Sequence, residues 1–296
     1  MVINMNKRSL SQRIFDIINI MIMLCVIVAC IYPMLYVLFA SLSDANEFLA
    51  HQGLLFKPLN ANLESYKAVF KNPLILKGYM NTLYILILGV CLNLVLTCLG
   101  AYFLSEKKVF FQKPITLYIL FTMLFSGGLI PFYLTVRALG MYNTRMALII
   151  PTVINTFNMI IMRTSFQGIP ESLKEAASID GASHLTILTK IVLPLSKTII
   201  AVMVLYYGVG HWNSWFNAMI FLNDRNLFPL QLVLQEILLG NDTNNMIVGQ
   251  SLSDGILLSE TIKYAVVIVA TVPILVIYPF LQKYFISGVM TGAVKG

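Results

Sequence analysis

The chain contains six long apolar runs, and they restrict its fold more than any other feature. Each run is close to the roughly 20 residues that a helix needs to cross a bilayer. Helices satisfy their own backbone hydrogen bonds in lipid, and the runs lack the alternating pattern typical of membrane barrel strands. We therefore expect an all-α, polytopic membrane protein with six transmembrane helices. The expected spans cover residues 15–40, 79–104, 115–136, 146–163, 198–222 and 264–286.

Composition agrees with this class. The chain is 58% hydrophobic and only 11% charged, whereas a soluble globular domain carries about 25% charged residues. The four cysteines all lie within the apolar runs, without the spacing or the nearby histidines of a zinc site. We interpret them as packing residues and expect no metal site and no disulfide.

The distribution of charge predicts the orientation in the membrane. If both termini are cytoplasmic, the inner side carries twelve basic and five acidic residues, and the outer side carries eight of each. The whole formal excess of +7 then falls on the inner side, as the positive-inside rule expects. The charge therefore indicates topology and not nucleic-acid binding, because no basic stripe alternates with stacking aromatics.

The spans divide the chain into one transmembrane domain with several connecting segments. The first apolar run is longer than that of a signal peptide and has no clear cleavage site, so we expect it to be retained. We expect a cytoplasmic lead at 1–14, a transmembrane domain at 15–296, outer segments at 43–78 and 223–263, a cytoplasmic loop at 170–194 and a tail at 284–296.

The apolar runs lack the residues that would supply energy for transport. Their cores contain no Asp or Glu, and the one ionisable group well inside is His211. Transporters coupled to ions or protons usually need carboxylates within the membrane. The chain also lacks the G-x-x-x-x-G-K-[ST] loop that cradles ATP phosphates. If it is a transporter, its energy must come from another subunit.

The most specific motif is EAASIDGASHLTILTKIVLP, from Glu175 to Pro194. We expect a short helix over 172–180, a stop at Gly181, which is a usual residue after a helix C-cap, and a second helix over 183–190. Such an elbow can dock on a partner, with Leu173, Ile179 and Leu185 entering an apolar groove. The alternative is an amphipathic loop on the membrane surface. The predicted docking residues are Glu175, Ala176, Ala177, Asp180, Gly181, Ile191, Leu193 and Pro194.

This motif resembles the coupling loop by which ABC-importer permeases dock on their ATPase subunits. The chain as a whole is similar to permease subunits of carbohydrate-uptake ABC importers, in particular the smaller permease of maltose-type transporters and permeases of the LplB/YtcP kind. The similarity runs from about the first span to the C-terminus and implies the type I ABC-importer permease fold. The segments GLIPFYLTVRALGMYNT, WNSWFNAMIFLND and KYFISGVMTGAVKG also carry it.

The resemblance implies a mechanism and a set of partners. A second, homologous permease would complete a heterodimer around a central path, and two ATPase subunits would bind the coupling loops. ATP and Mg²⁺ would belong to the ATPases, so this chain would bind no cofactor and catalyse no reaction. An extracellular or periplasmic binding protein would deliver a sugar or oligosaccharide to the path, in the cytoplasmic membrane of a bacterium.

A path for sugars needs aromatic faces for pyranose C–H groups and amides or hydroxyls for the ring OH groups. Alternatively, the amides form interhelical hydrogen bonds and the tryptophans lie at the membrane interface. His211 is more easily explained as structural. Gly127, Gly128 and Pro131 predict a break in the helix of span three. The path candidates are Trp212, Asn213, Trp215 and Asn217 in span five, Asn155 and Asn158 in span four, and Tyr133 at the broken end of span three.

Two other functions remain open. A membrane enzyme, such as a lipid-linked glycosyltransferase or an intramembrane protease, would need a catalytic constellation at a membrane face. His51, His184 and His211 lie on separate segments and form no such motif. An ABC permease for another solute, such as an amino acid or a metal, would carry the same coupling loop. The Trp/Asn segment and the tail favour a carbohydrate.

Overall fold

The computed structural model describes residues 10–107, 109–239 and 260–279, and over these ranges it is helical, with no strand. The predicted tail at 284–296, the end of the sixth span and most of the second outer segment lie outside the described residues. The chain forms two compact units: residues 1–71 with 242–269, and residues 72–241 with 270–296.

The first unit is built on one long helix. Its helices are α1 (Leu10–Ser41), α2 (Ala45–Ala50), α3 (Glu64–Lys71) and the first ten residues of the helix Glu260–Pro279. The rings of Phe48 and Tyr264 meet edge to face at 5.3 Å, and the Ser65 hydroxyl donates to the Thr261 hydroxyl at 2.9 Å. Residues 43–71, predicted as part of an outer segment, are thus folded against α1 and the helix Glu260–Pro279.

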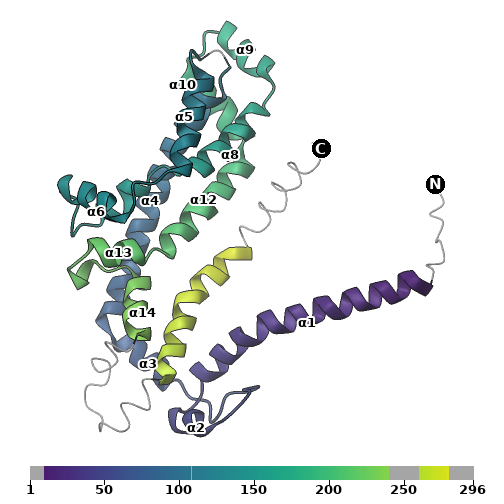
Figure 1. The fold of residues 1–296 in the computed structure, drawn as a ribbon, viewed down its shortest axis with the longest axis vertical. Coiled ribbons are helices and arrows are strands. Elements are labelled where there is room, and N and C mark those ends of the chain that lie inside the picture. Colours follow the sequence, from purple (N-terminus) through teal and green to yellow (C-terminus); the bar gives the residue numbers. More distant parts are fainter. Residues whose placement is uncertain (1–9, 108, 240–259, 280–296) are drawn as a thin grey trace. The chain divides into compact units, whose positions relative to one another are not determined.

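The second unit holds the remaining helices (Figure 1). The first group contains α4 (Pro73–Ser105), α5 (Gln112–Leu124), α6 (Leu129–Ala138), α7 (Met146–Ile149), the 3₁₀ turn η1 (Ile150–Thr152) and α8 (Thr156–Gln167). The second group contains α9 (Glu171–Ile179), α10 (His184–Ile187), the π-helical turn η2 (Leu188–Val192), α11 (Leu193–Leu195), α12 (Lys197–Trp212), α13 (Phe216–Phe221), η3 (Arg225–Leu227) and α14 (Leu230–Leu238).

Helix α4 is the axis of the second unit. Its 33 residues span about 50 Å at 1.5 Å per residue. The face of α4 that packs against its neighbours carries small and polar residues, which let helix backbones approach closely in lipid. This buried stripe includes Gly78, Thr82, Gly89, Asn93 and Thr97. Helices α8 and α12 pack along it, and the main apolar core lies between these three helices.

The structure supports up to six membrane spans. Three helices are long and apolar enough to cross by themselves: Ile14–Ser41, Pro73–Ser105 and Glu260–Pro279. Three further spans are helix pairs with a bend between them: 111° between α5 and α6, 48° between α7–η1 and α8, and 86° between α10–α11 and α12. The predicted number of spans is confirmed, but half of them are broken.

The break in the third span follows from its glycines. We expected Gly127, Gly128 and Pro131 to interrupt the helix, and α5 ends at Leu124 before α6 starts at Leu129. Gly128 has φ +83°, a conformation that L side chains rarely adopt. Because α5 has 13 residues, it extends only about 20 Å, and the run 115–136 is not one straight crossing.

The fifth span also differs from its predicted course. The run 198–222 is divided, because α12 ends at Trp212 and α13 begins at Phe216. At its other end the chain turns at Ser196, two residues after Pro194. Pro194 lies inside α11, directly after the π-helical turn. Proline has no N–H to donate to the carbonyl four residues earlier, and its ring crowds that carbonyl. These two effects account for the wider, π-helical turn before Pro194.

Candidate functional site

One end of the second unit is formed by α9 and α10, which make a helix–glycine–helix elbow (Figure 1). Two hydrogen bonds close α9: Ala182 N to Ala177 O at 2.9 Å, and Gly181 N to Ser178 O at 3.1 Å. This pair is the Schellman arrangement, which needs a residue with positive φ. Gly181 supplies it at φ +81°. The elbow therefore has the form that the sequence predicts.

The elbow presents apolar side chains away from its own core. The side chain of Ile179 is 86% exposed and that of Leu185 is 64% exposed, one on each side of Gly181. Glu175 and Ala176 are exposed on the same short helix, as are Asp180 and Gly181 at its end. Exposed apolar residues on a polar, protruding element are typical of a surface that binds another protein.

Three predicted docking residues have a different position. Ala177 packs against the main core, and so do Ile191 and Leu193. Ala176 and Ala177, both predicted to dock, do not share one outer face, because a helix places adjacent residues about 100° apart. Ala177, Ile191 and Leu193 therefore attach the elbow to the bundle, while Pro194 is exposed.

A polar network that the sequence did not indicate joins the elbow to the end of α4. Lys174 Nζ donates to Glu106 Oε1 at 2.6 Å, and its charge lies 5.7 Å from the centre of the Tyr102 ring. The Tyr102 hydroxyl is 3.3 Å from His184 Nδ1. Tyr102 therefore contacts both halves of the elbow. A second ion pair, Lys107 to Glu171 at 3.1 Å, lies nearer the surface.

A buried polar network lies in the middle of the bundle, at the break in the fourth span. Asn93 Nδ2 donates to the carbonyl oxygens of Thr152 and Val153, both at 2.8 Å. Its Oδ1 is 2.7 Å from His211 Nε2. Because the amide nitrogen serves the two carbonyls, Oδ1 must accept, and His211 must carry its proton on Nε2. The free carbonyls of the broken helix are satisfied in this way.

Two further contacts complete this central network. The Tyr207 hydroxyl lies 2.7 Å from Thr97 Oγ1 and accepts from Asn155 N at 3.4 Å. Gly89 lies against the imidazole of His211, where a Cβ atom would be only 2.5 Å from Nε2. Only glycine fits this close approach. His211, interpreted from the sequence as structural, holds the C-terminal end of α12 on α4.

Two segments that carry the resemblance meet in the structure. The Asn143 side chain accepts from Asn223 N and Asp224 N, both at 2.9 Å, and Asn143 N donates to Phe221 O at 2.8 Å. The ring of Tyr133 stacks on that of Phe221 with centroids 5.9 Å apart. Asn143 has φ +56°, which asparagine tolerates better than most residues. Tyr133, predicted for the substrate path, is half-buried in this contact.

The two tryptophans of the predicted path have unlike environments. Trp212 is 5% exposed and meets the Tyr79 ring edge to face at 6.3 Å, whereas Trp215 is 36% exposed. Asn213 is exposed beyond the end of α12, and Asn217 is half-buried on α13. The break between α12 and α13 separates the packing tryptophan from the exposed one.

The two predicted asparagines of span four are joined to each other. Asn155 is the N-cap of α8, where its Oδ1 accepts from Asn158 N at 3.0 Å. Such a cap satisfies one of the free N–H groups at the start of a helix. Asn155 is otherwise exposed, whereas Asn158 is buried.

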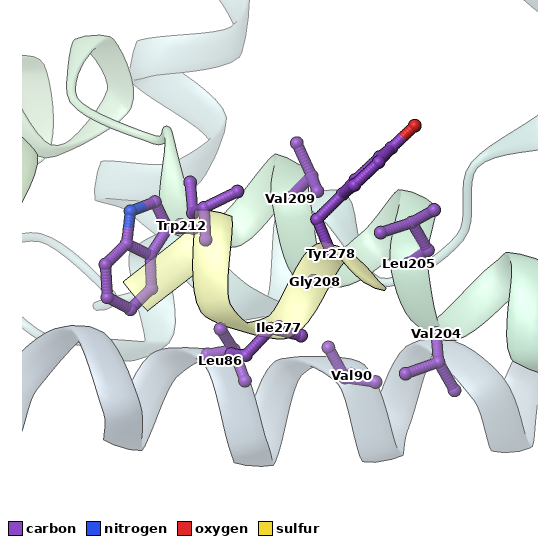
Figure 2. A pocket seen from close by; sticks show the side chains of 10 residues that line it. Leu86, Val90, Val204, Leu205, Gly208, Val209, Trp212, Ile277 and Tyr278 are labelled. Atoms are coloured by element: carbon purple, nitrogen blue, oxygen red, sulfur yellow. The ribbon is translucent and has the colours of Figure 1, made fainter. Parts of the chain in front are cut away.

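An apolar cavity of about 170 Å³ lies between α4, α12 and the helix Glu260–Pro279 (Figure 2). Trp212 borders it, and its indole Nε1 is buried without a hydrogen-bond partner in the described part of the chain. The lining offers few groups that could hold sugar hydroxyls. The lining residues are Leu86, Val90, Val204, Leu205, Gly208, Val209, Trp212, Ile274, Ile277 and Tyr278.

The three histidines do not converge. His51 Nε2 is 3.2 Å from the Leu54 carbonyl oxygen, and the other two bind Tyr102 and Asn93 in separate networks. Within residues 10–107, 109–239 and 260–279, no three His, Cys, Asp or Glu side chains could hold a metal ion together.

Comparison with known proteins identifies the family. Residues 1–291 match the family described as "Binding-protein-dependent transport system inner membrane component". The chain belongs to this family. It is a membrane permease of a binding-protein-dependent importer, with the type I ABC-importer permease fold.

Individual relatives agree over almost the whole length. The polygalacturonan/rhamnogalacturonan transport system permease YtcP of Bacillus subtilis is 37% identical, over 97% of this chain and all of the relative. The LplC protein of the same species is 39% identical, over 96% of each chain. A chain of a bacterial ABC transporter that imports the acidic polysaccharide alginate superposes with a TM-score of 0.87 at 31% identity, over 95% of this chain and 99% of that one. The resemblance read from the sequence is confirmed.

Proposed function

We propose that this permease pairs with a second, homologous permease to form the path of an ATP-driven importer for a sugar or oligosaccharide. The observation that carries the proposal is the exposed elbow around Gly181 on a chain of this family. The named relatives support a carbohydrate, since one is a polygalacturonan/rhamnogalacturonan permease and another belongs to an alginate importer. The charge asymmetry supports an orientation with both termini in the cytoplasm.

The elbow docks on an ATPase subunit. Ile179 and Leu185 enter an apolar groove of that subunit, and Glu175 and Asp180 face its basic groups. Gly181 sets the angle between the two short helices. ATP and Mg²⁺ bind to the ATPases, and two of these subunits serve the two permeases. The lack of carboxylates in the apolar cores supports this external source of energy.

The substrate path is lined by the exposed members of the predicted set, Trp215, Asn213 and Asn155, with Asn217 beside them. Their ring face, amides and carbonyls can hold a sugar ring. The buried members, Trp212 and Asn158, and the half-buried Tyr133 support these positions by packing. A binding protein outside the cell delivers the substrate to this path.

The docking role can be tested at Gly181. Gly181→Leu places a branched side chain at φ +81°, which strains the elbow. Gly140→Leu is a matched control, because Gly140 has φ +71° and equal free space but lies between α6 and α7. We expect the Gly181 variant to insert normally, and to lose both ATPase co-purification and uptake into proteoliposomes. Unchanged uptake would show that the elbow is not part of the docking surface.

The substrate class can be tested with the complete transporter. Uptake of labelled oligogalacturonate, alginate oligosaccharide, malto-oligosaccharide and an amino acid would be compared in the same proteoliposomes. Import of the amino acid and of no glycan would favour the alternative, a permease for another solute. Trp215→Ala should lower glycan uptake while ATPase assembly is kept. Equal loss of uptake and assembly would mean that Trp215 is a packing residue.

A further inference from the structure

The elbow is too small to hold its position alone. Helix α9 has nine residues, none of them fully buried, and α10 has four. Isolated helices shorter than about 12 residues are marginal in water. The position of the elbow must therefore come from contacts with the bundle. Ala177 and Ala182 supply some of them, but both side chains are small.

The polar contacts converge on one tyrosine. Tyr102 is buried near the end of α4 and lies against Lys174 of α9 and His184 of α10. It therefore bridges the two arms of the elbow on either side of Gly181. Glu106, just beyond α4, accepts the hydrogen bond from Lys174 at 2.6 Å. We call Tyr102, Glu106, Lys174 and His184 the α4 latch.

Two ion pairs connect the same two segments, and they differ in burial. In the Lys174–Glu106 pair the side chains are 12% and 21% exposed. In the Lys107–Glu171 pair they are 75% and 47% exposed. An exposed pair is screened by water and contributes little, whereas removal of one partner from a protected pair leaves a charge without compensation. The first pair thus restrains the elbow far more than the second.

Helix α4 connects the latch to the centre of the bundle. It is unbroken from Pro73 to Ser105, and carries Asn93 and Thr97 of the central network on the way to Tyr102. A displacement of the elbow that moves Tyr102 must move these residues with it. Of the three helices, α4 alone continues unbroken through the central network, because the span of α8 bends at that network and the span of α12 bends beside the elbow.

We propose that the α4 latch makes the elbow and α4 move as one body, and that motion of the ATPase reaches the broken centre of the bundle through α4. This inference rests on the proposed docking of the elbow. The four residues act as positioning residues and touch neither ATP nor sugar. The latch accordingly governs how much transport accompanies each ATP hydrolysed, and not whether the ATPase binds.

The first test is a charge exchange in the complete transporter. We expect Lys174→Glu and Glu106→Lys each to lower uptake per ATP hydrolysed about ten-fold, within the usual range of coupling energies, with ATPase co-purification retained. The double variant Lys174→Glu/Glu106→Lys should restore at least half of the coupling, because the pair is re-formed with opposite polarity. Lys107→Glu is the matched control and should change coupling less than two-fold, as for an exposed pair. Failure of the double variant to rescue, or equal effects of Lys107→Glu and Lys174→Glu, would overturn the latch.

The second test does not depend on transport. Spin labels are placed at exposed Ser172 on α9 and exposed Leu83 on α4, with the four native cysteines replaced by alanine. We expect one narrow distance distribution in the parent complex, in Lys107→Glu and in the double variant, and a broad one in Lys174→Glu. A narrow distribution in Lys174→Glu would overturn the latch, whatever the transporter carries. If the parent complex shows no ATP-driven glycan uptake, that result would contradict the proposed function and not the latch.

Discussion

The centre of the bundle and the elbow both depend on polar side chains, but these side chains serve different purposes. In the centre, Asn93 and His211 are buried and hydrogen-bonded to each other, and Asn93 also donates to the carbonyls of a broken helix. At the elbow, Lys174 and Glu106 are charged and border a surface. Unsatisfied polar groups are costly in lipid, so the central network is first a condition of folding. Because the Lys174–Glu106 pair borders a surface, we expect the fold to survive an exchange of its two charges, which leaves the pair available for coupling.

The strongest test of this contrast is Asn93→Leu. It leaves the carbonyls of Thr152 and Val153 and the proton on His211 Nε2 without their partner. Each unsatisfied buried group costs about 1–3 kcal/mol, so we expect a loss of several kcal/mol in the free energy of unfolding. Thermal denaturation in detergent would measure it, with Val95→Ala on the exposed face of α4 as the control. Equal melting temperatures for the two variants would contradict a folding role for the central network.

A smaller effect is expected for Gly89→Ala. Its Cβ would lie 2.5 Å from His211 Nε2, and overpacking of this kind costs about 1–3 kcal/mol. Gly208→Ala on α12 is the matched control, since nothing lies within 4 Å of its added Cβ. The same denaturation assay should show a lower melting temperature for Gly89→Ala alone. In the double variant Gly89→Ala/His211→Ala the imidazole is absent, so the added Cβ should lower the melting temperature less than it does beside His211. If the effects of the two substitutions on the free energy of unfolding simply add, the Cβ does not clash with the imidazole.

Tyr207→Phe should have a still smaller effect. The change removes one hydroxyl, which bonds Thr97 Oγ1 and the backbone of Asn155, and keeps the ring. Interhelical hydrogen bonds in membranes are worth about 0.6 kcal/mol on average. We expect a small fall in melting temperature. Adding Thr97→Val to Tyr207→Phe should lower the melting temperature no further, because both substitutions break the same contact. Full additivity of the two would show that the hydroxyls act separately.

The smallest change in stability is expected at the elbow. Ile179→Ser alters a side chain that is 86% exposed, and exposed substitutions usually change stability by less than about 0.5 kcal/mol. Yet we expect this variant to lose ATPase co-purification. Melting temperature and pull-down, measured on the same preparation, separate the two effects. Normal recovery of the ATPase would contradict a docking role for the elbow. A melting temperature as low as that of Asn93→Leu would contradict the different roles of the two regions.

Much of the site was open to prediction because its signals are local. The spacing around Gly181 predicts the elbow, since a positive-φ glycine after a short helix is a local requirement. Gly127 and Gly128 predict the break in span three for the same reason. The division of the fifth span after Trp212 was not predicted, because the break falls at Asn213 and Ser214 and contains no glycine or proline.

The polar networks could not be predicted, because each joins segments far apart in the chain. Lys174 and Glu106 are 68 residues apart, and Asn93 and His211 are 118 apart. Nothing in the sequence near Lys174 distinguishes it from other lysines of the predicted inner surface. Likewise, Trp212 and Trp215 look equivalent in the sequence, and only their contacts show that one is buried.

The sequence by itself determined the membrane class, the number of apolar runs and the place of the elbow, because hydrophobic length and backbone conformation are properties of neighbouring residues. Only the tertiary structure decided which polar side chains are satisfied inside the bundle and which alanine of the elbow faces inward. These outcomes depend on what packs opposite each residue. In a bundle of broken helices that partner comes from a distant span, and the chain near the residue does not specify it.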